Sequence, residues 1–333
     1  MLACEALLLE VRGLSVAFRT AAGLLQVTRD LNFSIAAGER LGVVGESGCG
    51  KTVTGLALLR LLPESHTSIS GQILFEGQDL ARLAAGPMRA IRGRDIAMIF
   101  QEPMTALDPV FSIGEQIAEA YRCHFPVSRA EARERAIAAL ASVGIPLPAR
   151  RHDEYPHQLS GGMRQRVMIA MALICEPELL IADEPSTALD VTVQAQILEL
   201  MQELSAQGNM AIVMITHDLG VIAGLCSRVM VMYAGEFCET GGVDKIFHDP
   251  QHPYTRGLVG SIPRLDKHGG RLIAIRGQPP NLQHLPKGCT FQERCDFVFD
   301  RCVAERPKLT GFAEGRAKAC HLKGFDAKRE VIR

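Results

Sequence analysis

The sequence contains no tryptophan and only 5% aromatic residues, and it lacks an excess of charge of either sign. Its 36 basic and 37 acidic residues leave a formal net charge of -1. A protein that binds nucleic acid through its phosphates usually presents a strongly basic surface. We therefore expect no nucleic-acid partner.

Long apolar runs are also missing. The longest, Val167–Cys175, has nine residues, whereas a membrane-spanning helix needs roughly 20. The N-terminus has no basic stretch, and Glu5 interrupts its apolar run, which argues against a signal peptide. We expect a soluble, cytoplasmic protein that reaches a membrane only through a partner.

Short apolar segments alternate with helical ones along the first 240 residues. Arg40–Val44, Leu179–Ala182 and Ala211–Thr216 are typical of buried strands, and Leu7–Phe18 alternates like a half-buried strand. The pattern is helical from about 103 to 175, where Ser128 begins a capping box. This alternation predicts an α/β fold with a mostly parallel sheet covered on both faces.

A glycine-rich loop follows the first buried strand. Gly45–Thr52 reads G-E-S-G-C-G-K-T, which fits G-x-x-x-x-G-K-[ST], and a helix is predicted from Lys51 to about Leu62. Glycines let backbone N–H groups converge on a phosphate, and the helix N-terminus adds positive potential. We expect Lys51 to bridge the β- and γ-phosphates and Thr52 to ligate Mg²⁺.

Two carboxylates end the strand that begins at Leu179. A buried strand of an α/β sheet delivers such residues to its C-terminal edge, where ligands of these folds bind. Asp183 is placed to hold Mg²⁺ through water, and Glu184 to polarise the attacking water. An acidic pair at a strand end is common, so this motif gains its meaning from the phosphate loop.

Residues 159–165, L-S-G-G-M-R-Q, resemble the signature sequence of ABC ATPases. The resemblance implies that Ser160 opens a helix whose N-terminus faces the γ-phosphate of ATP held by a second cassette. The sequence departs from the family at Met163, where glutamine is commoner, which removes one family hydrogen bond. The resemblance further implies that ATP is bound between two cassettes, which are either identical or paralogous.

Other positions resemble the family one by one. Gln101 follows a predicted strand as the Q-loop glutamine does, and His217 stands where the switch histidine contacts the γ-phosphate. Phe18 would stack on adenine, unless it is simply a core residue. The residues assigned to ATP are Phe18, Gly45, Glu46, Ser47, Gly48, Cys49, Gly50, Lys51, Thr52 and Gln101, with Ser160, Gly161, Gly162 and Met163 acting in trans. The catalytic set is Glu184, His217 and Lys51. Mg²⁺ is assigned to Thr52, Gln101 and Asp183, and the D-loop to Ser186, Ala188, Leu189 and Asp190.

Residues 101–109, Q-E-P-M-T-A-L-D-P, resemble one branch of this family, the ATPase subunits of dipeptide/oligopeptide permeases, as do His252–Thr255, Gln278–Leu282 and Leu285–Cys289. The resemblance implies a peripheral protein on the cytoplasmic face of the inner membrane, working with two transmembrane permease subunits and, indirectly, an extracytoplasmic binding protein. Transported solutes in this branch are dipeptides, oligopeptides, nickel chelates, opines and glutathione.

The resemblance also implies a P-loop, RecA-like core with an antiparallel β subdomain. The nucleotide-binding domain would span 1–240, with a helical subdomain at about 103–175, and residues 241–333 would form a small extension. In the helical subdomain, Glu102 and Met104 should face the permease.

Four of the ten cysteines lie in the extension, with spacing C-x5-C-x6-C-x17-C. They are Cys289, Cys295, Cys302 and Cys320. Such a set suits a [4Fe–4S] cluster or tetrahedral Zn²⁺. The spacing lacks the paired C-x2-C knuckles of zinc ribbons and, with the family resemblance, favours iron–sulfur over zinc, with unligated thiols as a third reading.

Two other functions compete with transport. One is a soluble ABC ATPase of translation or DNA repair, but such chains usually carry two fused cassettes or a long coiled coil. The other is a P-loop kinase or GTPase, neither of which explains the signature sequence. A structural or adaptor role would predict a damaged catalytic set, whereas Lys51, Asp183, Glu184 and His217 are all present.

Overall fold

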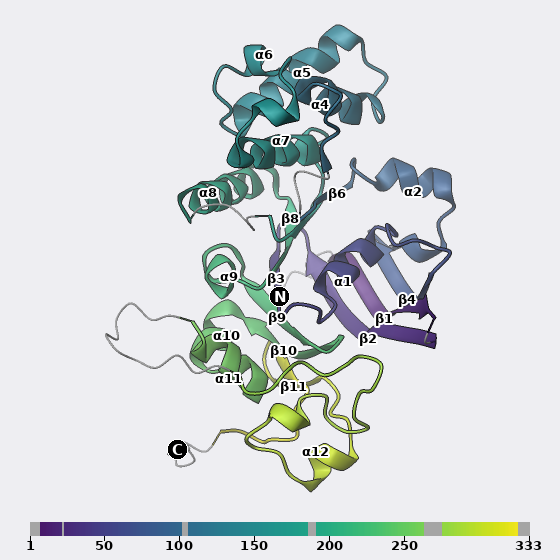
Figure 1. The fold of residues 1–333 in the computed structure, drawn as a ribbon, viewed down its shortest axis with the longest axis vertical. Helices are drawn as coiled ribbons and strands as arrows, with labels where there is room; N and C mark the ends of the chain where they lie inside the picture. Colours follow the sequence, from purple (N-terminus) through teal and green to yellow (C-terminus); the bar gives the residue numbers. More distant parts are fainter. Residues whose placement is uncertain (1–6, 22, 102–105, 186–190, 263–274, 326–333) are drawn as a thin grey trace, which may run out of the picture. The chain divides into compact units, whose positions relative to one another are not determined.

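The computed structural model describes residues 7–21, 23–101, 106–185, 191–262 and 275–325 (Figure 1). The chain divides into two compact units. The first comprises residues 1–9, 35–40 and 75–215, and the second comprises 10–34, 41–74 and 216–333. Each unit is assembled from three segments of the chain.

The first unit combines parallel strands with a group of helices. Its elements are β5 (Gln78–Asp79), α2 (Ala85–Ile91), β6 (Ile96–Ile99), α4 (Ile113–Arg122), α5 (Arg129–Ser142), α6 (Pro148–Arg151), α7 (Gly161–Leu173), β7 (Leu179–Asp183), α8 (Val191–Gly208) and β8 (Ala211–Thr216). Strands β8, β7 and β6 pair in that order and in parallel. Helices α4, α5 and α7 pack on one another, and α7 also packs on β6.

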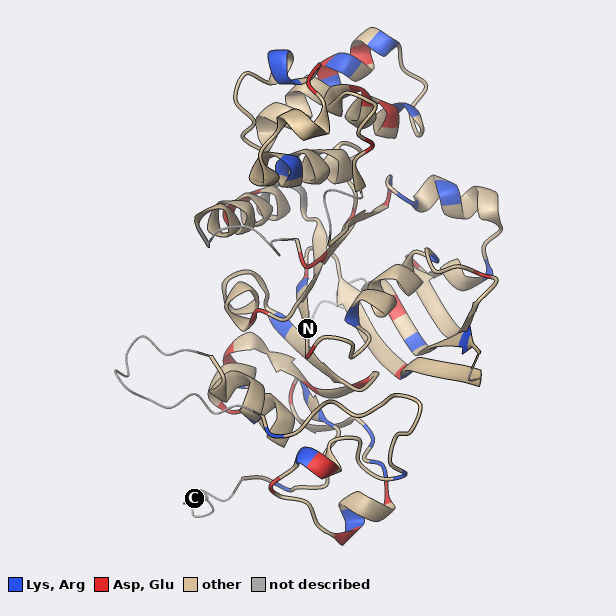
Figure 2. Cartoon of the chain, viewed as in Figure 1, with Lys and Arg blue, Asp and Glu red and all other residues tan. Residues whose placement is uncertain are grey.

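Burial follows the apolar sequence of these strands. Every residue of β7 and β8 is buried, as expected for central parallel strands covered on both faces. One half of the predicted capping box is present at α5, where the Ser128 hydroxyl accepts a hydrogen bond from the Glu131 N–H at 3.1 Å. Figure 2 shows acidic and basic residues interspersed along α4 and α5.

The second unit contains two sheets and the C-terminal segment, by which we mean residues 241–333. Its elements are β1 (Leu7–Thr20), β2 (Gly23–Ala36), β3 (Arg40–Val44), α1 (Lys51–Leu58), β4 (Thr67–Phe75), α9 (Leu219–Leu225), β9 (Arg228–Tyr233), β10 (Glu236–Gly242), α10 (Val243–His248), α11 (Pro253–Gly260), α12 (Asp300–Ala304), β11 (Thr310–Ala313) and β12 (Arg316–Lys318). The hairpin β1–β2 and β4 form an antiparallel sheet in the order β2-β1-β4. The other sheet runs β11-β12-β10-β9-β3.

Helix α1 is shorter than the sequence predicts. It ends at Leu58 rather than near Leu62, because Arg60 adopts a left-handed conformation at φ 51°. The N–H of Leu61 then donates to the Leu56 carbonyl at 2.9 Å, and that of Arg60 to Ala57 at 3.0 Å. These two bonds close the helix as a Schellman motif before proline is reached.

The C-terminal segment contributes strands that its weak periodicity did not predict. Strand β12 pairs antiparallel with β10, with Glu239 opposite Lys318, and β11 pairs with β12. The segment therefore extends a sheet that begins with β3 and β9. A single edge of three to four residues is too short to produce a detectable alternation in the sequence.

Candidate functional site

The phosphate-binding motif forms the strand–loop–helix arrangement that its sequence predicts. The loop leaves β3, passes through Gly48 and Gly50 with φ of 79° and 107°, and enters α1 at Lys51. A Cβ on Gly45 would lie 2.2 Å from the Met232 carbonyl oxygen. Glycine is therefore required at position 45 by close approach of another strand, and at 48 and 50 by backbone conformation.

Lys51 lies in the mouth of this loop. Its Nζ donates to the carbonyl oxygens of Gly45 at 2.8 Å and Glu46 at 3.1 Å. Ser47, Gly48 and Thr52 are exposed at the loop tip and the first helical turn. Burial raises the pKa of the Cys49 thiol, which therefore stays neutral and does not compete with a phosphate for Lys51.

The acidic pair lies at the end of β7 in the first unit. Asp183 is 2% exposed and sits opposite Ile215 in the parallel ladder. Glu184 turns out of the strand at φ 46°, held by its N–H, which donates to the Ile215 carbonyl at 2.8 Å. The strand therefore ends at Asp183, and Glu184 begins the turn that follows it.

Gln101 and Glu184 are brought together although 83 positions separate them. The Gln101 amide Nε2 donates to Glu184 Oε2 at 3.1 Å. Gln101 follows β6 and Glu184 follows β7, and these strands are neighbours in the sheet. Two residues chosen from separate motifs thus meet at one sheet edge.

The signature helix begins where the sequence predicts. Ser160 is the exposed N-cap of α7, and its hydroxyl accepts a hydrogen bond from the Met163 N–H at 3.3 Å. Gly161 and Gly162 form the first turn, so backbone N–H groups are presented without a covering side chain. The arrangement is that of a helix N-terminus available to an anion.

The remaining predicted positions are placed as follows. Phe18 is half-buried in β1, and His217 is exposed immediately after β8. The D-loop residues Ser186, Ala188, Leu189 and Asp190 lie outside the described residues, as do Glu102 and Met104. The adenine contact of Phe18 and the γ-phosphate contact of His217 stay predictions.

The four C-terminal cysteines line one small pocket, together with His252 and Phe291. The Cys289 N–H donates to the Cys302 carbonyl at 2.8 Å, which holds two of the cysteine segments together. Burial raises the pKa of the Cys289 thiol to about 11 and that of Cys295 to about 12. Within the described part of the chain, no three His, Cys, Asp or Glu side chains are arranged to hold a metal ion.

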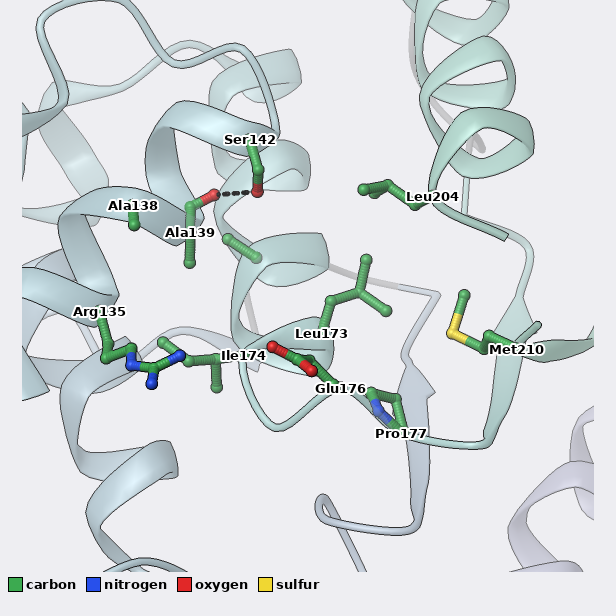
Figure 3. A pocket seen from close by; sticks show the side chains of 11 residues that line it. Arg135, Ala138, Ala139, Ser142, Leu173, Ile174, Glu176, Pro177, Leu204 and Met210 are labelled. Atoms are coloured by element: carbon green, nitrogen blue, oxygen red, sulfur yellow. Dashed lines mark hydrogen bonds between the residues drawn. The ribbon is translucent and has the colours of Figure 1, made fainter. Parts of the chain in front are cut away.

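A pocket of about 480 Å³ lies in the first unit, away from these motifs. It is lined by residues of α5, α7 and α8 and by the turns that follow them (Figure 3). Leu173, Leu204 and Met210 provide apolar walls, and Arg135 and Glu176 add charges. The sequence-predicted nucleotide residues that the structure describes do not line it.

One contact at the phosphate loop was not predicted from the sequence. Glu46 forms a bidentate ion pair with Arg294, whose two Nη atoms lie 2.6 Å and 2.9 Å from the carboxylate oxygens. The Glu46 N–H donates to the Tyr254 hydroxyl at 2.9 Å. Both partners come from the C-terminal segment. Glu46 belongs to the glycine-rich motif and Tyr254 to the His252–Thr255 stretch, and no sequence pattern linked the two.

Comparison with known proteins first defines the class. A family model described as ABC transporter matches residues 28–187, and one described as oligopeptide/dipeptide transporter, C-terminal region, matches residues 238–302. The dimeric structure of MJ0796, a bacterial ABC transporter cassette, is 25% identical with a TM-score of 0.63, covering 71% of this chain and 98% of that one. CbiO1 from Clostridium perfringens is 28% identical with a TM-score of 0.61, covering 73% and 91%. The fold is an ABC cassette, and the chain is an ABC-type ATPase.

Curated relatives then define the family. The oligopeptide transport ATP-binding protein OppD of Haemophilus influenzae is 50% identical over 95% of this chain and 97% of its own length. The dipeptide transport ATP-binding protein DppD of Bacillus subtilis is 49% identical over 97% of both chains. This chain belongs to the oligopeptide/dipeptide family of ABC transporter ATP-binding proteins. Among its described residues, no helix is both long and apolar enough to cross a membrane.

Proposed function

We propose that this chain hydrolyses ATP to drive an importer of dipeptides, oligopeptides or related small solutes such as nickel chelates, opines or glutathione. The observation that carries the proposal is end-to-end similarity to OppD and DppD, including the C-terminal region that is particular to their family. The partners are a second cassette, identical or paralogous, two transmembrane permease subunits and, indirectly, an external binding protein. The site of action is the cytoplasmic face of the cell membrane.

The catalytic roles follow from the chemistry of phosphoryl transfer. The glycine loop and Lys51 bind the β- and γ-phosphates. Thr52, Gln101 and Asp183 would hold Mg²⁺, which would supply positive charge to offset that of the phosphates. Glu184 orients and polarises the attacking water, and Gln101, hydrogen-bonded to it at 3.1 Å, positions this carboxylate. His217 contacts the γ-phosphate.

The second cassette completes the site. The exposed N-terminus of α7, capped by Ser160, supplies backbone N–H groups of its first turn to the γ-phosphate bound by the opposite cassette. The dimeric MJ0796 cassette supports this arrangement. ATP binding therefore draws two cassettes together, and hydrolysis separates them, which moves the permease.

Replacement of Glu184 by glutamine tests the hydrolytic role. The variant should bind ATP with the affinity of the wild type and lose at least about 100-fold in kcat, because it keeps the shape of the side chain but removes the base. Glu176→Gln is a matched control: it also has a positive φ, of 56°, and is exposed in the same unit. Full hydrolysis by Glu184→Gln would exclude the carboxylate as the base.

The competing function, a soluble ABC ATPase with no permease, predicts a different dependence on membrane partners. Reconstitution of the chain with its permease subunits in vesicles should stimulate ATPase activity when binding protein and peptide are supplied. ATPase activity that is indifferent to permease, binding protein and peptide would favour the alternative.

We also propose that Cys289, Cys295, Cys302 and Cys320 bind a [4Fe–4S] cluster, with zinc as the alternative. Four thiols line one pocket and match such a cluster in number and type of donor, although the structure does not arrange them as a metal site. Burial raises the pKa of Cys289 and Cys295 and so opposes their ionisation, and a bound cation offsets that penalty. The metal would staple a segment with few apolar contacts of its own.

Metal analysis of anaerobically purified protein tests this assignment. About four iron atoms and four acid-labile sulfides per chain are expected, and both should be lost in Cys302→Ser but kept in Cys123→Ser, whose cysteine is exposed and distant in sequence. One zinc per chain would select the alternative. Protein with neither metal would remove the proposal.

A further inference from the structure

Glu46 is the second residue of the phosphate loop, and its carboxylate is bound by a side chain from outside the loop. Arg294 Nη1 donates to Glu46 Oε2 at 2.6 Å, and Nη2 donates to Oε1 at 2.9 Å. Two parallel charge-assisted bonds fix the orientation of a carboxylate as well as its position. The Arg294 side chain is 5% exposed and that of Glu46 26%, so water screens the pair weakly.

Arg294 is itself held in place before it meets Glu46. Its Nε donates to the Arg276 carbonyl at 2.8 Å, and Nη1 also reaches the Tyr233 hydroxyl at 3.3 Å. The guanidinium lies over the rings of Tyr233 and Phe291, 5.7 and 5.8 Å from their centroids. A side chain with this many contacts acts as a rigid support rather than as a mobile surface cation.

The backbone of Glu46 has a second support. Its N–H donates to the hydroxyl of Tyr254, a residue of α11 that is completely buried. The start of α11 is anchored in turn by Glu239, whose carboxylate accepts hydrogen bonds from the N–H groups of Gln251 and His252, both at 2.8 Å. A buried carboxylate that accepts two backbone hydrogen bonds fixes the path of the chain into the helix.

Glu46 also contacts the lysine of the loop. The Glu46 carbonyl accepts a hydrogen bond from Lys51 Nζ at 3.1 Å. Glu46 is therefore bound to the phosphate-binding lysine on one side and to the C-terminal segment on the other. A shift of Glu46 would change both the path of the loop and the position of the ammonium group.

We propose that Arg294 and Tyr254 are positioning residues for the phosphate loop, and that the C-terminal segment thereby sets the affinity of the cassette for ATP. The inference rests on the proposed role of the loop in nucleotide binding. It adds to Glu46, a residue of the predicted ATP-binding set, a structural contact with the C-terminal segment. It differs from a purely structural attachment of the segment, which would leave ATP affinity unchanged.

Binding of a fluorescent ATP analogue to the full-length chain tests the proposal. Arg294→Gln and Glu46→Gln should each raise the Kd about tenfold, because each removes one partner of a largely buried charge pair. The double variant should be no weaker than the weaker single variant, since both changes break the same interaction. Arg294→Lys, which keeps the charge but not the fork, should give an intermediate Kd.

Arg301→Gln is the matched control. It removes an arginine from an exposed ion pair with Glu305 in the same C-terminal segment. It should leave both the Kd and the thermal midpoint unchanged. A lowered midpoint with wild-type Kd in Arg294→Gln would mean that the pair only attaches the segment, and would overturn the proposal.

Two further variants keep the test decisive. Tyr254→Phe removes only the hydroxyl and should also raise the Kd, so it replaces Arg294→Gln if that variant fails to fold. Lys51→Ala tests the loop itself: unchanged binding would refute the underlying function. Lost binding in Lys51→Ala together with wild-type Kd in the Tyr254 and Arg294 variants would refute the positioning role alone.

Discussion

Substitution of Gly45 by alanine should destabilise the second unit because there is no room for a methyl group. The Cβ would lie 2.2 Å from the Met232 carbonyl oxygen, 3.2 Å from its carbonyl carbon and 2.8 Å from the Cys49 sulfur. Two of these three atoms are backbone, so relief requires β3 and β9 to move apart. Overpacking of this kind costs about 3 kcal/mol, which lowers the thermal midpoint by roughly 6 °C or more.

Gly48→Ala is the comparison that isolates the steric effect. Its φ is 79°, but nothing lies within 4 Å of the added Cβ, so only backbone strain of about 1 kcal/mol is expected. Differential scanning calorimetry of both variants should therefore give a larger drop for position 45. Equal midpoints for the two variants, or a wild-type midpoint for Gly45→Ala, would refute the close approach of β9 to the loop.

Two further pairs of variants separate local stability from function. Ser160→Ala and Ser128→Ala each remove an N-cap and should each cost about 1 kcal/mol of stability. Only the Ser160 variant should weaken ATP-driven association of cassettes in analytical ultracentrifugation. Equal association of the two variants would contradict the role of α7 in trans. Glu239→Gln should lower stability by about 2 kcal/mol, because the buried carboxylate that accepts hydrogen bonds from the two residues before α11 is lost. The exposed Glu305→Gln should leave the thermal midpoint unchanged, and a Glu239 variant as stable as the wild type would show that this buried carboxylate does not anchor α11.

The parts of the fold that the sequence predicted are those with local signals. Glycine spacing identified the loop before Lys51, and a four-residue apolar run placed Asp183 and Glu184 at a strand end. Both are confirmed as local structure. The meeting of Gln101 with Glu184 followed from the rule that parallel strands end at one sheet edge, although the sequence alone did not supply their hydrogen bond.

The parts that the sequence missed depend on contacts between distant positions. Arg294 and Glu46 are 248 residues apart, and no sequence motif predicts that they form a pair. Strand β12 is three residues long and acquires its conformation from pairing with β10. The early end of α1 reflects the left-handed conformation of Arg60, a residue with no intrinsic preference for it.

The central claim is that two cassettes enclose ATP between the phosphate loop of one and the α7 N-terminus of the other. Sedimentation velocity of Glu184→Gln protein, alone and mixed with its partner cassette, tests it most directly. The account predicts a monomer without nucleotide and a dimer when ATP and Mg²⁺ are added. Protein that binds ATP to saturation and still sediments as a monomer, in the presence of its partner cassette, would contradict it.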